Sequence, residues 1–241
     1  MTEAARRSTP PTLPRPITQS HSNQNVETDI RRRVFKTVLI TDSILRHVGS
    51  MDTANALGTN HKLELINKRD SSGLNDNRLR SDVVNKKPDY IYVHLGVNDV
   101  QQQVSTKDSL INFYSFMLFI NENLPQTKLF LSLPLFTGDT EANHEIADLR
   151  DILRMYVSST EDNRPLKDRN VFINSNTNFM RNGRLVPELY GPDVVHLTET
   201  GKGLILANMR HSIHEMTRII LNKPRRAERQ SNERRSRVST L

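Results

Sequence analysis

The chain has 241 residues, which is enough for one domain of ordinary size with additional residues at its ends. It contains no cysteine, which excludes disulfides and thiolate catalysis, and no apolar run approaches the roughly 20 residues of a membrane span. The net charge of +7 lies at the ends, because residues 1–33 carry +3 and residues 223–241 carry +5, so residues 34–222 carry −1.

Both ends have compositions typical of disordered segments. Residues 1–33 are rich in Pro, Ser and Thr without periodic apolar positions, and residues 223–241 are rich in arginine. We therefore predict one folded domain over 34–222 between two basic tails. Such tails either bind nucleic acid through sequence-independent phosphate contacts or act as solvated, solubilising ends. No apolar segment follows the early arginines, so no secretory signal is predicted and we expect a cytoplasmic or nuclear protein.

Between the tails, strand patterns alternate with helical patterns. Short runs rich in apolar and β-branched residues predict five strands, at 34–40, 62–67, 90–95, 128–135 and 170–174. Apolar residues at helical spacing predict helices that begin near residue 43 and that span 109–124, 142–157 and 198–221. This alternation predicts an α/β fold with a mostly parallel central sheet and helices on both faces.

Three polar stretches follow the first three predicted strands. Thr41-Asp42-Ser43 follows the first, Gly73 comes shortly after the second, and Gly96-Val97-Asn98-Asp99 follows the third. Ligands of such sheets bind at the carboxyl ends of the strands. The sequence therefore predicts a site at this edge of the sheet.

Ser43 is the candidate nucleophile. A serine directly after a buried strand has its hydroxyl at the edge of the sheet, and its backbone N–H lies at the positive end of the following helix. The simpler alternative is that Asp42 or Ser43 only caps that helix.

The candidate base is His196, three residues after Asp193. In one tight turn this spacing lets the carboxylate accept a hydrogen bond from Nδ1 while Nε2 faces the nucleophile. The alternative is an aspartate that caps a turn beside an ordinary packing histidine.

Asn98 and Gly73 are candidate donors to a developing oxyanion, since an amide side chain or a glycine N–H can fill that role. Turn-forming Gly, Asn and Asp are the alternative explanation for both stretches. We assign Asp99 a structural role, bonding backbone near these loops. A metal held by Asp42 and Asp99 would need a third ligand that the sequence does not supply, so no metal site is predicted.

The order Ser43, Gly73, Gly-x-Asn-Asp at 96–99 and Asp-x-x-His at 193–196 resembles the SGNH hydrolase superfamily, the GDSL-type esterases and lipases. The resemblance covers roughly residues 34–218. It implies a flavodoxin-like three-layer α/β/α sandwich and a serine esterase that needs no cofactor.

In the resemblance, Ser43, Asp193 and His196 are the catalytic residues, and Ser43, Gly73 and Asn98 form the oxyanion hole. The implied reaction is deacetylation or hydrolysis of a small or lipid-like acyl ester. One departure is Thr41, which stands where the family has glycine and could crowd the turn that presents the nucleophile.

The segment Asp42-Ser43-Ile44-Leu45-Arg46 also resembles the esterase domains of some non-LTR retrotransposon proteins. That likeness implies a nucleic-acid or membrane-associated context. The alternative function is a module of the same fold that has lost activity and binds nucleic acid or protein through its basic tails. In either case we assign specificity to loops around 71–82, 136–144 and 176–192.

Overall fold

A computed structural model describes residues 34–45, 57, 61–158 and 170–217 of the chain. The predicted tails at 1–33 and 223–241 lie outside the described residues, as do the last residues of the predicted folded domain. Among the helices that are described, none is both long and apolar enough to cross a membrane.

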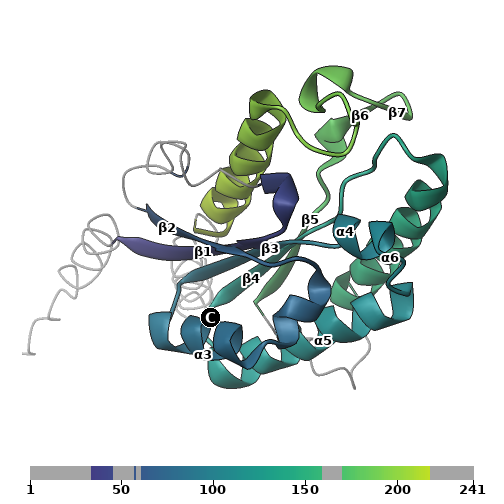
Figure 1. The fold of residues 1–241 in the computed structure, drawn as a ribbon. Coiled ribbons are helices and arrows are strands. Elements are labelled where there is room, and N and C mark those ends of the chain that lie inside the picture. Colours follow the sequence, from purple (N-terminus) through teal and green to yellow (C-terminus); the bar gives the residue numbers. More distant parts are fainter. Residues whose placement is uncertain (1–33, 46–56, 58–60, 159–169, 218–241) are drawn as a thin grey trace, which may run out of the picture. The chain divides into compact units, whose positions relative to one another are not determined.

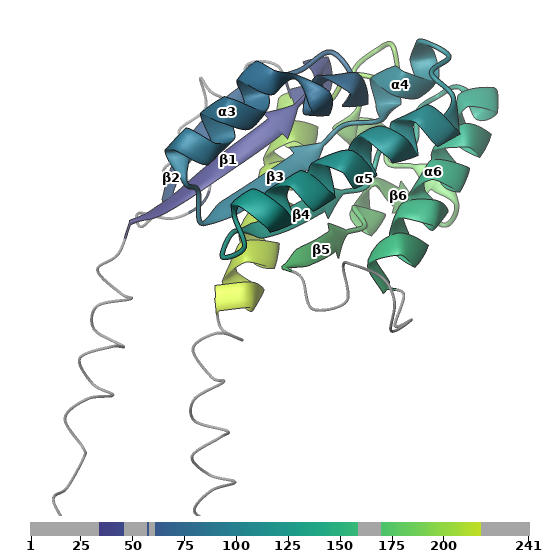
Figure 2. The same cartoon turned by 90° about the horizontal axis from the view of Figure 1, so that it is seen from below.

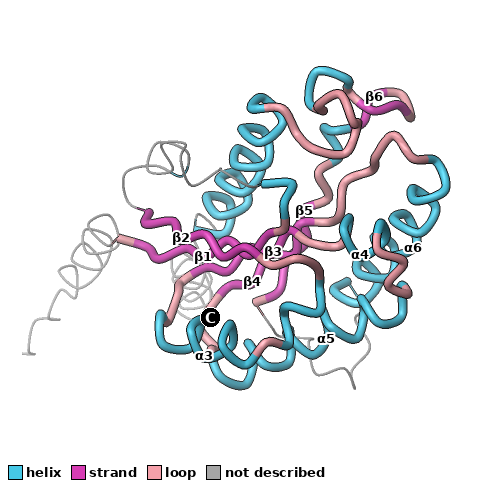
Figure 3. The backbone as a smooth tube through the Cα atoms, viewed as in Figure 1, coloured by secondary structure: helices cyan, strands magenta, loops and turns pink. Residues whose placement is uncertain are grey.

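The core of the domain is a sheet of five strands whose paired neighbours all run parallel. The strand order is β2-β1-β3-β4-β5, with β1 in the interior of the sheet (Figure 3). The strands are β1 (Phe35–Thr41), β2 (His61–Asn67), β3 (Tyr90–His94), β4 (Lys128–Ser132) and β5 (Val171–Asn174). Each of the five corresponds to a predicted strand.

Helices cover both faces of the sheet, which gives the predicted three-layer α/β/α sandwich (Figures 1 and 2). Leu39 faces the final helix, residues 199–217, and packs with Leu206 and Met209. Val38 and Ile40 point to the opposite face, where they pack with residues of α3 (Asn77–Lys86), α5 (Thr106–Asn123) and α6 (Thr140–Ser158). Alternate residues of β1 are buried on opposite faces, so the strand reads as a continuous apolar run.

The structure corrects the sequence prediction in one of the expected loops. Residues 71–82 are helical rather than irregular, with the 3-10 helix η3 (Ser71–Asn75) leading into α3. The helical signal of α3 is weak because only Leu79 and Val83 are buried in its ten residues. Helix formation here depends on caps, since Asp70 accepts from Ser72 N and Asp76 accepts from Arg78 N.

The 3-10 helix η1 (Ser43–Leu45) begins where a helix is predicted near residue 43, and the residues that follow it, 46–56, lie outside the described part of the chain. Five short elements without a sequence signal complete the described domain: α4 (Val97–Gln101), η4 (Thr177–Phe179), β6 (Met180–Arg181), β7 (Arg184–Leu185) and η5 (Pro187–Leu189).

Two glycines of the final helix have opposite packing environments and provide a stability test. A Cβ on Gly201 would lie 2.1 Å from the carbonyl oxygen of Leu189, whereas a Cβ on Gly203 would meet nothing within 4 Å. We expect Gly201→Ala to destabilise the protein by about 1–3 kcal/mol through overpacking. We expect Gly203→Ala to stabilise it by about 0.5–1 kcal/mol, because alanine favours the helix. Urea unfolding of both variants measures this, and a Gly201→Ala variant as stable as wild type would contradict the close approach.

Candidate active site

Ser43 lies at the carboxyl end of β1, where it begins η1. The strand before it is buried, and the side chain of Ser43 itself is only partly buried. Thr41 is the last residue of β1, and its backbone pairs with Asn67 of β2 and His94 of β3. Among the described residues, Thr41 is not one of those with a positive φ, so the turn accommodates a β-branched side chain at this position.

Asp42 is almost fully buried beside Ser43, with 1% of its surface exposed. Its Oδ1 accepts a hydrogen bond from the backbone N–H of Ile44 at 2.9 Å, which fixes the turn that carries Ser43. Burial raises the pKa of Asp42 to about 7, and the carboxylate of Asp99 adds to the rise. The Ile44 N–H and the charge of His196 act in the opposite direction.

Asn98 is held in the first turn of α4, a short helix rather than an irregular turn. Gly96 caps this helix with a φ of 114°, and a Cβ there would lie 2.6 Å from Pro134 Cγ, so only glycine fits. The Asn98 amide donates from Nδ2 to the carbonyl oxygen of Arg69 at 2.8 Å. Since an amide nitrogen carries two hydrogens, a second N–H of Asn98 is available to another acceptor.

Asp99 has the structural role predicted for it. One carboxylate oxygen accepts from the backbone N–H of Ser71 at 3.0 Å, and the other accepts from the hydroxyl groups of Ser71 and Ser109. The buried carboxylate thus joins η3, α4 and α5 and anchors the loop that follows β2. Within the described residues, no group of three His, Cys, Asp or Glu side chains could hold a metal.

Gly73 lies inside η3, and its backbone N–H donates to the carbonyl oxygen of Asp70 at 3.3 Å. It is not one of the residues that line the cleft described below. The role predicted for Gly73 as an oxyanion donor therefore requires this hydrogen bond to open.

Asp193 and His196 form the contact that their spacing predicts. His196 Nδ1 lies 2.6 Å from Asp193 Oδ2, and the other carboxylate oxygen accepts from the backbone N–H groups of Val195 and His196. The hydrogen bond to His196 and these two N–H groups lower the pKa of Asp193 to about 2. Both side chains are about half exposed, at 52% for Asp193 and 54% for His196.

The turn between these two residues contains a strained backbone position. Val194 has a φ of 54°, in the left-handed region that β-branched residues avoid. Its N–H donates to the Gly191 carbonyl, and its carbonyl accepts from the Gly138 N–H, both at 3.0 Å. Because strain of this kind persists where the surroundings impose it, these bonds hold the Asp193–His196 turn in one shape.

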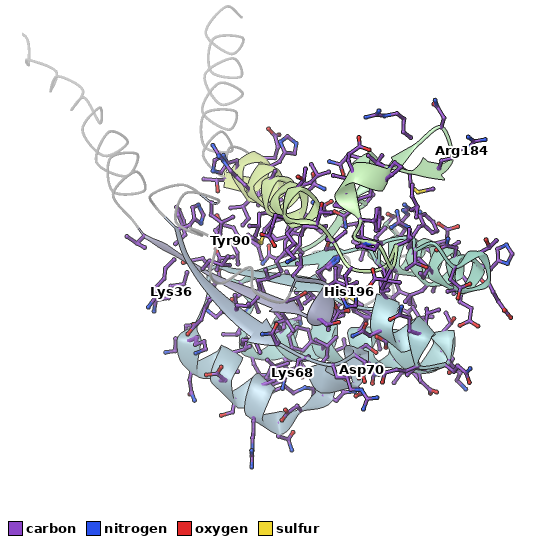
Figure 4. All side chains as sticks on the ribbon, turned by 45° about the horizontal axis from the view of Figure 1, so that its top comes forward. Lys36, Lys68, Asp70, Tyr90, Arg184 and His196 are labelled. Atoms are coloured by element: carbon purple, nitrogen blue, oxygen red, sulfur yellow. The ribbon has the colours of Figure 1, made fainter. Side chains whose placement is uncertain are left out.

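A cleft of about 540 Å³ opens at the carboxyl ends of β1 and β2, beside α4. The cleft brings together Ser43 and Asn98, and its complete lining is Asp42, Ser43, Asn67, Lys68, Arg69, Asn98, Gln101 and Gln102. In Figure 4, Lys68, Asp70 and His196 are seen away from Lys36, which lies near the amino end of β1, the end opposite the cleft. Within the described part of the chain, Ser43 Oγ forms no hydrogen bond, so the structure does not join it to His196.

Sequence reasoning missed much of this lining. Lys68 and Arg69 directly follow the predicted second strand, 62–67. Their position at a strand's carboxyl end, where ligands of such sheets bind, could have identified them. Gln101 and Gln102 lie at the end of α4, a helix too short to give periodicity. His94, the last residue of β3, is buried with its Nδ1 2.8 Å from Ser132 Oγ, and this burial lowers its pKa to about 4.

Comparison of the sequence with protein-family models and with curated proteins finds no match. Solved structures do match. A GDSL-like lipase from Bacteroides thetaiotaomicron VPI-5482 is 19% identical with a TM-score of 0.60, over 81% of this chain and 98% of that one. A carbohydrate esterase family 3 protein from Talaromyces cellulolyticus is 17% identical with a TM-score of 0.56, over 76% and 97%. An acetyl esterase mutant with acetate ion is 16% identical with a TM-score of 0.58, over 77% and 99%. The chain therefore has the fold of the GDSL-type, or SGNH, hydrolases.

Proposed function

We propose that this protein is a serine esterase that hydrolyses short acyl esters, with Ser43 as nucleophile. The observation that carries the proposal is the 2.6 Å contact between Asp193 and His196, on a fold shared with a lipase and two esterases. A histidine held at Nδ1 by a carboxylate has its Nε2 free to act as a base, and serine needs such a base.

In the proposed reaction, Ser43 Oγ attacks the ester carbonyl while its proton passes to His196 Nε2. Asp193 orients the imidazole and stabilises the imidazolium. The tetrahedral intermediate collapses as the imidazolium protonates the leaving alcohol, which leaves the acyl group on Ser43. Water then attacks the acyl-enzyme as His196 Nε2 takes its proton. The bond between the acyl carbon and Ser43 Oγ breaks, Oγ takes the proton back from the imidazolium, and the carboxylic acid is released. Proton transfer requires Nε2 within about 2.6–3.2 Å of Oγ, a contact that catalytic pairs often complete only with substrate bound.

The charge on the intermediate's oxygen needs donors at the carboxyl end of the sheet. The backbone N–H of Ser43 and the second N–H of the Asn98 amide are the proposed donors. Gly73 is a third only if its bond to Asp70 opens. The cleft contains both Ser43 and Asn98, which supports this pairing.

The proposal is tested with the purified protein and an activated ester. We expect turnover of p-nitrophenyl acetate, faster than that of longer acyl chains, and inactivation by diethyl p-nitrophenyl phosphate with one adduct per chain. Mass spectrometry should locate that adduct on Ser43, because phosphorylating agents of this kind react with an activated serine. A folded protein without turnover, or an adduct on another residue, would refute the proposal.

Asn98→Ala is expected to lower kcat by about 10²–10³-fold with little change in KM, since an oxyanion donor acts mainly in the transition state. Asn75→Ala is the matched control, because Asn75 also bridges two segments through its amide, to Asn112 at 2.6 Å, but lies outside the cleft lining. Steady-state kinetics with p-nitrophenyl acetate gives both constants. Equal kcat values for the two variants would show that Asn98 is not an oxyanion donor.

A further inference from the structure

All eight side chains that line the cleft beside Ser43 are polar. An apolar groove exists elsewhere, between α5 and α6, where Leu110, Ile111 and Tyr156 are part of its wall. A lipid-like substrate would need an apolar surface next to the nucleophile, because burial of hydrocarbon drives its binding. The lining of the cleft instead suits a polar alcohol portion.

The cleft contains two basic residues, Lys68 and Arg69, and within the described segments only Lys68 has an acidic partner. Lys68 Nζ pairs with Asp76 Oδ2 at 2.7 Å, and the Lys68 side chain is 18% exposed. Arg69 is exposed, and in the segments that the structure describes its guanidinium has no hydrogen bond or ion pair. The neighbouring acid, Asp70, uses its carboxylate to accept from the backbone N–H and hydroxyl of Ser72. Among the residues that the structure describes, no acid therefore neutralises the charge of Arg69.

The backbone of Arg69 is fixed relative to the proposed reaction centre. Its carbonyl oxygen accepts the 2.8 Å hydrogen bond from Asn98 Nδ2, so the main chain that carries the guanidinium is tied to the proposed oxyanion donor. Gln101 and Gln102 add amide groups to the same cleft. The acid of the cleft, Asp42, is buried with its pKa raised to about 7, so at neutral pH it opposes an anion less than an ordinary aspartate would.

We propose that this cleft selects acyl esters whose alcohol portion carries an oxyanion, a carboxylate or a phosphate, and that Arg69 binds that oxyanion. This inference rests on the proposed function of Ser43 as the nucleophile. A guanidinium matches the geometry of both oxyanions through paired N–H donors. Arg69 is thus a specificity-determining residue for the leaving alcohol.

The test uses three acetate esters of one ring: 4-acetoxybenzoate, 4-acetoxyphenyl phosphate and the neutral 4-acetoxybenzamide. Each kcat/KM is divided by the hydroxide-catalysed rate of the same ester, which removes differences between the leaving groups. At low salt we expect wild type to prefer an anionic ester over the amide by about five- to ten-fold, and this preference should shrink as salt is added. The better of the two anions identifies the oxyanion that is recognised.

Arg69→Gln should abolish the preference, measured within the variant as the ratio of the normalised kcat/KM for an anionic ester to that for the neutral amide, and because the Asn98 bond uses the backbone of Arg69 the side-chain change leaves that bond in place. The matched control is Arg184→Gln, which removes the same charge from the β6–β7 hairpin, away from Lys68 in Figure 4. If wild type shows no preference, or if both variants lose it equally, the role of Arg69 is overturned.

Binding to the Ser43→Ala variant separates this inference from the esterase proposal. We expect 4-acetoxybenzoate or 4-acetoxyphenyl phosphate to bind that variant at least about five-fold more tightly than the amide in NMR titrations. Adding Arg69→Gln should remove the difference. If the anionic esters bind selectively to Ser43→Ala but wild type hydrolyses none of the three esters, the esterase proposal is refuted and the proposed anion site is supported. If wild type hydrolyses all three esters and Ser43→Ala binds them with equal affinity, or if Ser43→Ala binds none of them, the proposed anion site is refuted.

Discussion

Ser43→Ala is expected to lower hydrolysis of p-nitrophenyl acetate by roughly 10³- to 10⁶-fold, the range for loss of a serine nucleophile. The change removes one hydroxyl that has no hydrogen-bond partner among the described residues, so the free energy of unfolding should be nearly unchanged. Steady-state kinetics measures the loss, and urea unfolding verifies that the variant is folded.

The matched control is Ser72→Ala. Ser72 follows β2 near the same edge of the sheet, but its hydroxyl bonds to Asp70 and it does not line the cleft. We expect this variant to retain wild-type turnover. A Ser43→Ala protein that is folded and still hydrolyses the ester at a wild-type rate would show that the acyl group is never carried by Ser43.

Asp42→Asn is expected to remove a large pH dependence of stability. Burial raises the pKa of Asp42 in the folded protein to about 7, from an ordinary value of 3.8 that applies to the unfolded chain. Between these two values the folded protein holds a proton that the unfolded chain has released, so stability falls as pH rises through this window. At 1.36 kcal/mol per pKa unit, the loss between about pH 5 and about pH 8 is on the order of 3 kcal/mol.

The asparagine keeps a carbonyl oxygen that can accept the 2.9 Å bond from Ile44 N–H but cannot ionise. Urea unfolding gives the free energy of unfolding of wild type and of Asp42→Asn at both pH values. The change with pH in the variant is subtracted from the change in wild type, which removes the contribution of the other titrating groups. Asp151→Asn, at an aspartate whose side chain is 70% exposed, serves as the control. If wild type and Asp42→Asn change in parallel with pH, Asp42 is not buried as a carboxyl in the folded protein.

Local patterns were sufficient to predict the sheet and the layers. Residues 34–40 form a continuous run of strand formers between a charged segment and a polar turn, and that run becomes β1 in the interior of the sheet. The long helices α5 and α6, which contain many apolar residues, were predicted to within a few residues of their ends. The predicted tails and domain limits remain predictions, because 1–33 and 218–241 lie outside the described residues.

The weakly patterned elements could not be predicted, because caps and tertiary contacts stabilise them. In α4, for example, a glycine with φ 114° begins a helix of five residues, and its position depends on Pro134, which lies 38 positions along the chain. The residues around Gly96 in the sequence give no indication of its close approach to Pro134.

For the candidate site, the sequence alone determined which residue types stand after which strands, and that Asp193 and His196 can meet in one turn. Both are local properties, since strand order along the chain and a three-residue spacing are short-range. Only the tertiary structure decided that Asp42 is buried and that the backbone carbonyl of Arg69 accepts a hydrogen bond from Asn98. These features depend on contacts between segments far apart in the chain and on exclusion from water, and neither is encoded in local periodicity.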